Sequence, residues 1–239
     1  MAANAKDMKA TSFDLWLKAL AERSGDAVAL ATNDGGESLS FAEVERRSAV
    51  TSAGLKALGL RRGDAVAIWL PNSPLWMVLH FAAARAGILT IPINTWCRDS
   101  EVSHLLRLGR CKGIFIDPAF HNIDFAGILA RVVAEFEAAG DNPLRWVCST
   151  GDAQCDIPSV PNVSLRALQQ LGTDAPKPRR EPAEPSPAGE CVIAFTTSGT
   201  TAAPKLALHR EGALIAHAEA IARRARMSSS DVALAALPP

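Results

Sequence analysis

The feature that most constrains the fold is a regular alternation of apolar runs and amphipathic segments in the middle of the chain. Four short runs are almost wholly apolar, as expected for strands buried on both faces, at residues 65–70, 88–93, 114–116 and 145–148. The segments between them have the apolar spacing of helices, at residues 74–86, 99–108 and 124–139. Because helices that join parallel strands form right-handed crossovers, this order predicts an α/β fold of mostly parallel, layered sheets with helices on both faces.

Local signals mark the boundaries of several elements. Ser40, followed three residues later by Glu43, predicts a capping box for a helix that reaches about Leu58. Ser73 before Pro74 predicts an N-cap with proline at the first helical position. Close to the last residue, the apolar pattern over 231–237 predicts one further strand.

Composition excludes several classes of protein. The 239 residues carry 25 basic and 25 acidic side chains, and this balance argues against a general nucleic-acid surface. The longest apolar stretch, residues 75–93, is interrupted by His80, Arg85 and Pro92, so no transmembrane segment is predicted. The five cysteines are scattered without metal-ligand spacing, which favours reduced thiols in a cytoplasmic protein and no metal site of their own.

The candidate ligand-binding segment follows an apolar run at residues 191–195. It is rich in small hydroxyl residues and ends in Pro204 and Lys205. A polyphosphate-binding site needs hydroxyl donors, a glycine that lets the backbone come close to the ligand, and an ammonium group. The candidate phosphate-binding residues are Thr197, Ser198, Gly199, Thr200, Thr201 and Lys205.

Two other interpretations of this stretch compete with a phosphate site. A Walker-type P-loop does not fit, because no glycine precedes Lys205 and Leu206 stands where that motif requires a hydroxyl. A serine- and threonine-rich surface turn that binds nothing remains open on the residues alone, since such residues are ordinary turn formers. For His80 and His104, which lie within predicted helices, a packing or surface role is the simpler interpretation.

The full string from Thr197 to Lys205 closely resembles the signature loop of the adenylate-forming (AMP-binding) superfamily, Ser/Thr-Ser-Gly-Ser/Thr-Thr-Gly-x-Pro-Lys-Gly. That superfamily includes acyl-CoA synthetases and peptide-synthetase adenylation domains. Further segments match it in order and spacing, at residues 39–44, 63–68, 70–73, 86–87 and 91–94. Two of the usual glycines are replaced, by Ala202 and Leu206; the alanine would be strained if its φ must be positive.

The resemblance implies a partial N-terminal domain of the adenylate-forming fold. It implies a ligase that uses ATP with Mg²⁺ to convert a small carboxylic acid into an acyl-adenylate, and then passes the acyl group to coenzyme A, as in fatty acid metabolism. Thr197, Ser198, Gly199, Thr200, Thr201 and Lys205 would then grip the β- and γ-phosphates of ATP. The alternatives are an adenylation domain that serves a carrier protein and a non-catalytic nucleotide-binding fragment.

The same resemblance suggests a domain organisation. We expect an N-terminal α/β subdomain at residues 1–172, a proline-rich linker at 173–190, and at 191–239 the start of a second α/β subdomain with the phosphate-binding loop. Family members are about twice this length or more, so the adenine site, the Mg²⁺ ligand and the catalytic residues are expected beyond Pro239. The C-terminal half would be the missing partner, and this chain alone is expected not to form acyl-adenylate.

Overall fold

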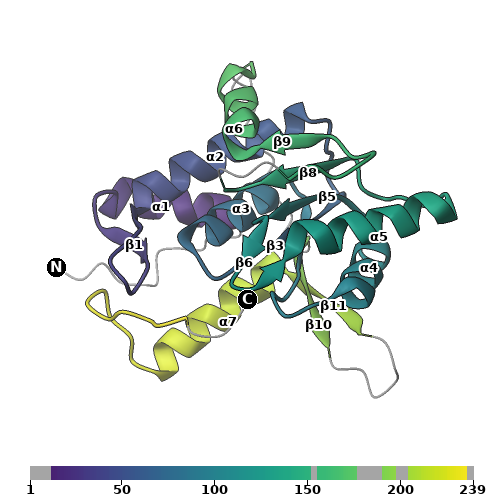
Figure 1. Ribbon diagram of the computed structural model, residues 1–239. Helices are drawn as coiled ribbons and strands as arrows, with labels where there is room; N and C mark the ends of the chain where they lie inside the picture. The colour runs from purple at the N-terminus through teal and green to yellow at the C-terminus, as the bar shows by residue number, and fades with distance from the viewer. Residues whose placement is uncertain (1–11, 152–154, 177–189, 198–203, 236–239) are drawn as a thin grey trace.

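The computed structural model describes residues 12–151, 155–176, 190–197 and 204–235, and within them the chain forms one large sheet flanked by helices (Figure 1). The strands of the large sheet are β3 (Ala65–Trp69), β4 (Leu89–Pro92), β5 (Cys111–Ile116), β8 (Trp146–Ser149), β9 (Asn162–Ser164), β10 (Cys191–Thr197) and β11 (Lys205–Arg210). Two small hairpins are formed by β1 (Val28–Ala31) with β2 (Ser38–Ser40) and by β6 (Ala119–Phe120) with β7 (Ile123–Asp124). The helices are α1 (Phe13–Ser24), α2 (Phe41–Ala57), α3 (Pro74–Arg85), α4 (Asp99–Leu108), α5 (Phe125–Ala139), α6 (Leu165–Asp174) and α7 (Glu211–Arg224).

The large sheet has the mostly parallel topology that the sequence predicts. Its seven strands lie in the order β11-β10-β4-β3-β5-β8-β9. Every neighbouring pair from β10 to β9 is parallel, and only β11 runs antiparallel, as the return strand of a hairpin with β10. The predicted α/β class is therefore confirmed.

The sheet is buried on both faces because successive side chains of its central strand point in opposite directions. Ala67 and Trp69 of β3 join the core that α4 and α5 cover. Val66 and Ile68 join the core on the other face, together with residues of α2, α3 and α6. All four are completely shielded from solvent, which is why these strands read as continuous apolar runs.

The helix boundaries follow the predicted caps. The Ser40 side chain accepts a hydrogen bond from the Glu43 backbone N–H, and the Glu43 carboxylate accepts one in return from the Ser40 N–H. The Ser73 hydroxyl likewise accepts from the Trp76 N–H, with Pro74 at the first helical position. Both predicted boundaries are confirmed, since each cap satisfies backbone donors that the first helical turn leaves unpaired.

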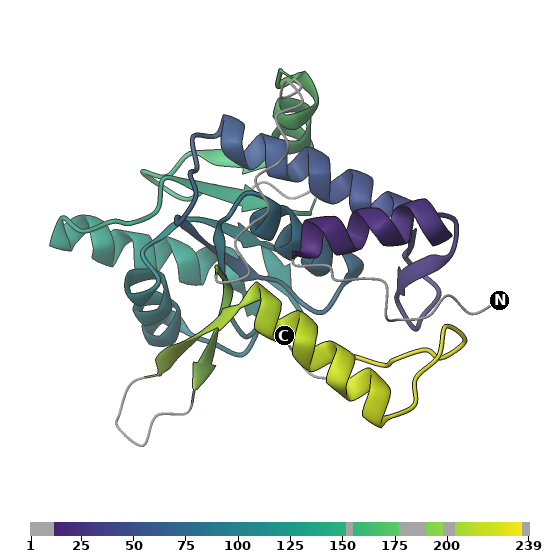
Figure 2. The ribbon, with the colours of Figure 1, turned by 180° about the vertical axis from the view of Figure 1, so that it is seen from behind.

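A second layer of helices packs against α3 on one side of the sheet. Figure 2 shows α1 and α2 side by side in this layer, and a small core that includes Leu17, Val44 and Val78 fills the space between the three helices. On the outer side, α6 approaches α2 so closely that a Cβ built at Gly54 would lie 2.2 Å from the Leu168 carbonyl oxygen. Glycine at this position is therefore a requirement of helix packing rather than of backbone angle.

The start of α7 is tied to the start of α1. Glu211 is 1% exposed, and its Oε1 accepts a hydrogen bond of 2.6 Å from the Phe13 backbone N–H, 198 residues away. The Glu211 N–H donates to the Glu190 carbonyl at 2.9 Å. A buried carboxylate thus joins the first helix of the chain to the last one described.

One predicted strand is not formed. Residues 231–235 have no strand conformation, and 236–237 lie outside the described residues. Val232 is 96% exposed and Leu234 80% exposed. An apolar pattern gives a strand only where a neighbouring strand accepts its backbone hydrogen bonds, and no described strand does so for this segment.

The predicted linker at 173–190 falls largely outside the described residues, which omit 177–189. Beyond it, β10 and β11 belong to the same hydrogen-bonded sheet as β3 and β4. The division of the chain at residue 172 remains a prediction. Among the described helices, none combines the length and the apolar character needed to cross a membrane.

Candidate phosphate-binding hairpin

The candidate site lies at the end of the hairpin formed by β10 and β11. Strand β10 is anchored in the sheet, because Val192, Ile193 and Ala194 are buried and Ile193 pairs with Thr90 of β4. Its last residues, Thr196 and Thr197, are exposed beyond the core. The strand therefore carries the site from the buried sheet to the surface.

Two of the predicted site residues face each other where the hairpin opens. Thr197, the last residue of β10, pairs with Lys205, the first residue of β11, and both are exposed. An ammonium group and a hydroxyl are thus held at opposite ends of the loop that joins the strands. The other predicted site residues lie outside the described residues: Ser198, Gly199, Thr200 and Thr201, as does Ala202.

The sequence around Lys205 explains its exposure. Pro204 has no backbone N–H to add to the ladder, and the strand begins at the next residue. Leu206 is partly buried and packs against the core that α4 and α5 cover. Because side chains alternate along a strand, Lys205 points to the opposite face, into solvent. The leucine that replaces the family's glycine therefore serves as an anchor for β11.

A contact that the sequence did not predict joins helix α4 to this hairpin. The Nε2 atom of His104 lies 2.7 Å from the carbonyl oxygen of Pro204. A carbonyl can only accept, so Nε2 carries the proton in this contact. The two residues are 100 positions apart, and no local pattern connects them. Only the packing of α4 beside the hairpin brings them together.

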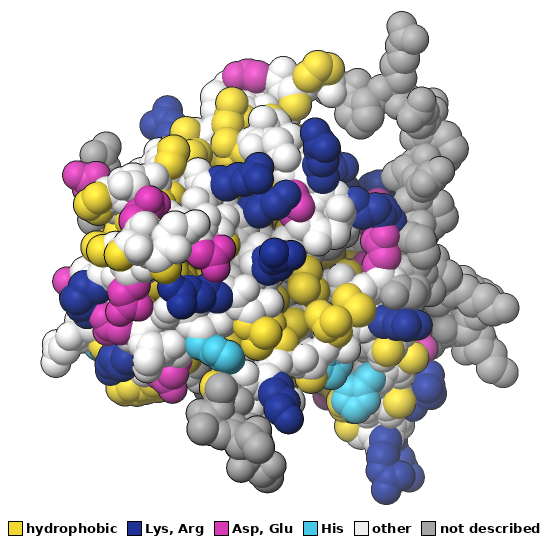
Figure 3. Space-filling model, turned by 90° about the vertical axis from the view of Figure 1, so that its right-hand side faces the viewer, with side chains coloured by type: hydrophobic (Ala, Val, Ile, Leu, Met, Phe, Trp, Pro, Cys, Tyr) yellow, Lys and Arg dark blue, Asp and Glu magenta, His cyan; other side chains and the backbone are white. Residues whose placement is uncertain are grey.

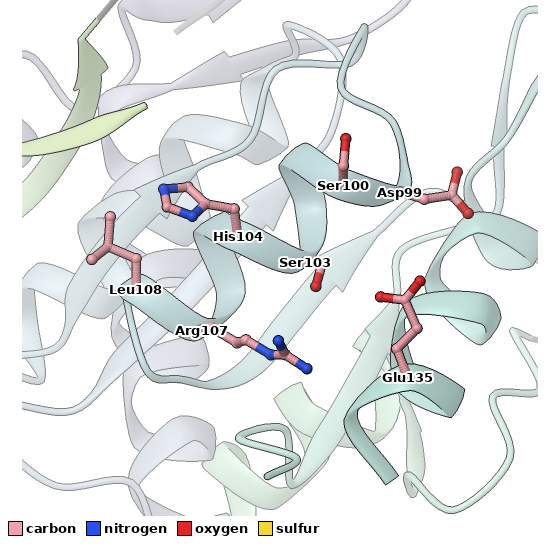
Figure 4. A pocket seen from close by; sticks show the side chains of 7 residues that line it. All are labelled: Asp99, Ser100, Ser103, His104, Arg107, Leu108 and Glu135. Carbon is pink, nitrogen blue, oxygen red and sulfur yellow. The ribbon is translucent and has the colours of Figure 1, made fainter. Parts of the chain in front are cut away.

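His104 also lines a wide hollow of about 720 Å³ on the outer surface of α4. Figure 4 shows the hollow's other side chains along the helix, with Glu135 of α5 across from them and the imidazole turned away from Glu135. The lining residues are Asp99, Ser100, Ser103, His104, Arg107, Leu108 and Glu135. Their charges are mixed, so the hollow does not select for an anion or for a cation.

A smaller hollow of about 290 Å³ is lined by four basic side chains and by one acidic side chain, that of Asp141. Figure 3 shows this side of the molecule, where Lys and Arg side chains gather. The basic residues of the hollow are Arg107, Arg110, Lys112 and Arg145. Structural roles account for two of them, because Lys112 pairs with Asp64 and the Arg107 guanidinium lies 4.7 Å above the centre of the Phe136 ring. The hollow also lies beside the ends of α4 and α5, where positive charge complements the helix dipoles.

The described residues do not by themselves offer a magnesium site. Within them, no three histidine, cysteine or acidic side chains come together. At the hairpin, Thr197 and Lys205 supply a hydroxyl and a cation, whereas Mg²⁺ prefers carboxylate and phosphate oxygens. The described hairpin residues thus suit an anionic group better than a metal ion.

Comparison with known proteins places the chain in a family. The sequence model of the AMP-binding enzyme family matches residues 17–239, which is nearly the whole chain. The chain belongs to the AMP-binding enzyme family. This membership confirms the resemblance inferred from the signature loop and from the segments before it.

Among curated members of the AMP-binding enzyme family, the chain is 30% identical over 231 residues to the salicyl-AMP ligase / salicyl-S-ArCP synthetase of Mycobacterium tuberculosis, covering 95% of this chain and 38% of that protein. It is 34% identical over 129 residues to the mitochondrial medium-chain acyl-CoA ligase ACSF2 of Mus musculus, covering 54% of this chain and 21% of that protein. The chain therefore spans about a fifth to two fifths of the length of these relatives.

Solved structures of AMP-binding enzymes share the fold. The putative long-chain-fatty-acid CoA ligase from Rhodopseudomonas palustris superimposes with a TM-score of 0.76 at 22% identity, over 95% of this chain and 51% of that one. The apo structure of MbtA from Mycobacterium smegmatis gives a TM-score of 0.73 at 23% identity, over 96% of this chain and 39% of that one. At these identities the likeness concerns the fold alone.

Proposed function

We propose that this chain supplies the phosphate-binding hairpin of an AMP-forming acid–thiol ligase. The observation that carries the proposal is the register of Thr197 opposite Lys205 at the exposed end of a strand buried in the sheet. Such a hairpin presents a hydroxyl and an ammonium from backbone positions that strand pairing holds opposite each other. The membership in the AMP-binding enzyme family supports a nucleoside triphosphate as the ligand.

In the proposed reaction, a carboxylate oxygen of the acid attacks the α-phosphorus of ATP, and the bond to the pyrophosphate oxygen breaks. A thiolate then attacks the acyl carbon, and AMP leaves. The contribution of this chain is to hold the β- and γ-phosphates in place while the bond to them breaks. Lys205 would compensate the charge that develops on the leaving pyrophosphate, and Thr197 would donate a hydrogen bond to it. Mg²⁺, when bound, would neutralise further phosphate charge.

The acceptor of the acyl group separates two candidate functions. Medium-chain acyl-CoA ligases among the relatives support coenzyme A as the acceptor and a fatty acid as the substrate. The second candidate uses an aryl acid and a carrier-protein acceptor. It is supported by the salicyl-AMP ligase / salicyl-S-ArCP synthetase, whose similarity extends over 95% of this chain. We propose a cytoplasmic location for either enzyme. The third candidate is a non-catalytic nucleotide-binding role for the chain itself.

Nucleotide binding by the purified chain tests the proposal. We expect isothermal titration calorimetry to show ATP binding that Lys205→Ala weakens by about 10- to 150-fold, because a hydrogen bond to a charged group contributes roughly 1.5–3 kcal/mol. Lys56→Ala is the matched control, since Lys56 is an exposed lysine on α2 and its loss removes the same charge. Equal weakening by both variants would show that only net charge matters and would contradict the site.

An ATP–pyrophosphate exchange assay with a panel of aliphatic and aryl carboxylic acids addresses the reaction. We expect no exchange by this chain alone, and exchange once the remaining part of a full-length relative is supplied with it. The acid that supports exchange separates the two candidate functions. Binding of ATP without exchange under every condition would favour the non-catalytic role.

A further inference from the structure

We propose that His104 is a positioning residue that orients Lys205 by donating a hydrogen bond to the carbonyl oxygen of Pro204. The inference rests on the proposed function of the hairpin, and nothing in the family comparison assigns a role to this histidine. The contact of 2.7 Å between Nε2 and the carbonyl oxygen carries it.

The donor is held by a rigid element. Helix α4 is fixed against the sheet by Val102, Leu105 and Leu106, each at most 1% exposed. His104 projects from the same helix toward the hairpin and is itself half-buried. In Figure 4 its imidazole lies on the side of α4 away from Glu135. A donor on an anchored helix has a fixed position, so the hydrogen bond constrains the hairpin and not the helix.

The acceptor lies where such a constraint has most effect. The carbonyl of Pro204 belongs to the peptide plane that links Pro204 to Lys205, so a hydrogen bond to it restrains the backbone N and Cα atoms from which the Lys205 side chain departs. The proline ring fixes φ of the same residue. Leu206, packed against the core on the other side of Lys205, is the second anchor. The lysine therefore sits between two fixed points on the chain.

The consequence for function is preorganisation. A lysine side chain has several rotatable bonds, and its ammonium reaches a phosphate reproducibly only if its backbone is held still. His104 provides that restraint without touching the ligand. It therefore acts through Lys205 and is not a catalytic residue.

Hydrogen exchange and nucleotide binding on the full chain test this role. Without nucleotide, we expect His104→Ala to raise the exchange rate of the β11 amides by about fivefold, since a hydrogen bond of ordinary strength is lost. The dissociation constant for ATP should rise by about three- to tenfold. His104→Gln keeps a side-chain N–H donor of similar reach and should stay within about twofold of the wild type in both measurements. His217→Ala, which removes an exposed histidine of α7, is the control.

His104→Phe separates the effect of the N–H donor from that of the ring, because it keeps an aromatic side chain without any N–H. It also takes the place of His104→Ala if that variant does not fold. We expect His104→Phe to behave like His104→Ala. Wild-type exchange in the β11 amides of both donor-free variants would overturn the proposal, as would a glutamine variant as impaired as they are. Failure of the wild type to bind ATP would contradict the proposed function alone, because the exchange measurement requires no nucleotide.

Discussion

His80 is a buried histidine on α3, and its ionisation should destabilise the folded protein. Its side chain is 5% exposed, and its Nδ1 lies 3.1 Å from the hydroxyl of Thr90, which is completely buried. Aromatic rings of Phe13, Trp76 and Phe81 surround the imidazole with centroid distances of 5.7–5.9 Å. Burial lowers the pKa of His80 from 6.5 to about 4, since the charged form is poorly solvated there.

The sign of the effect on stability follows from proton binding. Between pH 6.5 and 4 the unfolded chain protonates this histidine and the folded chain does not, so unfolding takes up a proton and the folded state loses stability as the pH falls. Above pH 6.5 both states are neutral and the contribution is complete. This lowering of the pKa corresponds to about 3 kcal/mol in total. Most of it is lost between pH 7.5 and 4.5.

The assay is urea unfolding of the wild type and of His80→Asn at several pH values. Asparagine keeps a polar partner for Thr90 but cannot titrate. Carboxylates titrate equally in both proteins, so the difference between the two unfolding free energies isolates His80. We expect that difference to shift by about 2 to 3 kcal/mol in favour of the variant between pH 7.5 and 4.5.

A shift below about 0.5 kcal/mol would refute the reasoning, because it would mean that the folded protein solvates or pairs the imidazolium. A direct titration of the His80 ring by nuclear magnetic resonance would then give a pKa near its ordinary value of 6.5.

Two further predictions concern contacts between helices. Gly54→Ala should lower the unfolding free energy by about 1–3 kcal/mol, because the new Cβ would lie 2.2 Å from a backbone oxygen of α6. This loss should outweigh the preference of alanine for helices. Chemical denaturation measures the change, and a stabilised variant would contradict the close approach of the two helices. Glu211→Ala should lower the unfolding free energy by about 1.5–3 kcal/mol, since it removes the acceptor of the Phe13 N–H. It should also raise the rate of hydrogen exchange at the start of α1. Unchanged exchange there would show that the carboxylate does not hold α1 in place.

The alternation of apolar and amphipathic segments in the sequence was sufficient to predict the α/β class, because a strand buried on both faces must be apolar throughout and a helix covering it must be apolar on one side. The helix starts at Ser40 and Ser73 were equally predictable, since a cap is satisfied within three residues. The signature string, together with the ordered segments that precede it, was sufficient to indicate the family, and the family match over residues 17–239 bears this out.

The tertiary structure decided what depends on neighbours distant in sequence. The pattern at 231–237 predicted a strand, but residues 231–235 form none because no described strand pairs with them. The role of Leu206 as an anchor followed only from its position against the core. The contact of His104 with Pro204 joins residues 100 positions apart. Sequence patterns report periodicity and local hydrogen bonding, whereas such contacts depend on where packing places a helix beside a hairpin, and only the fold determines that.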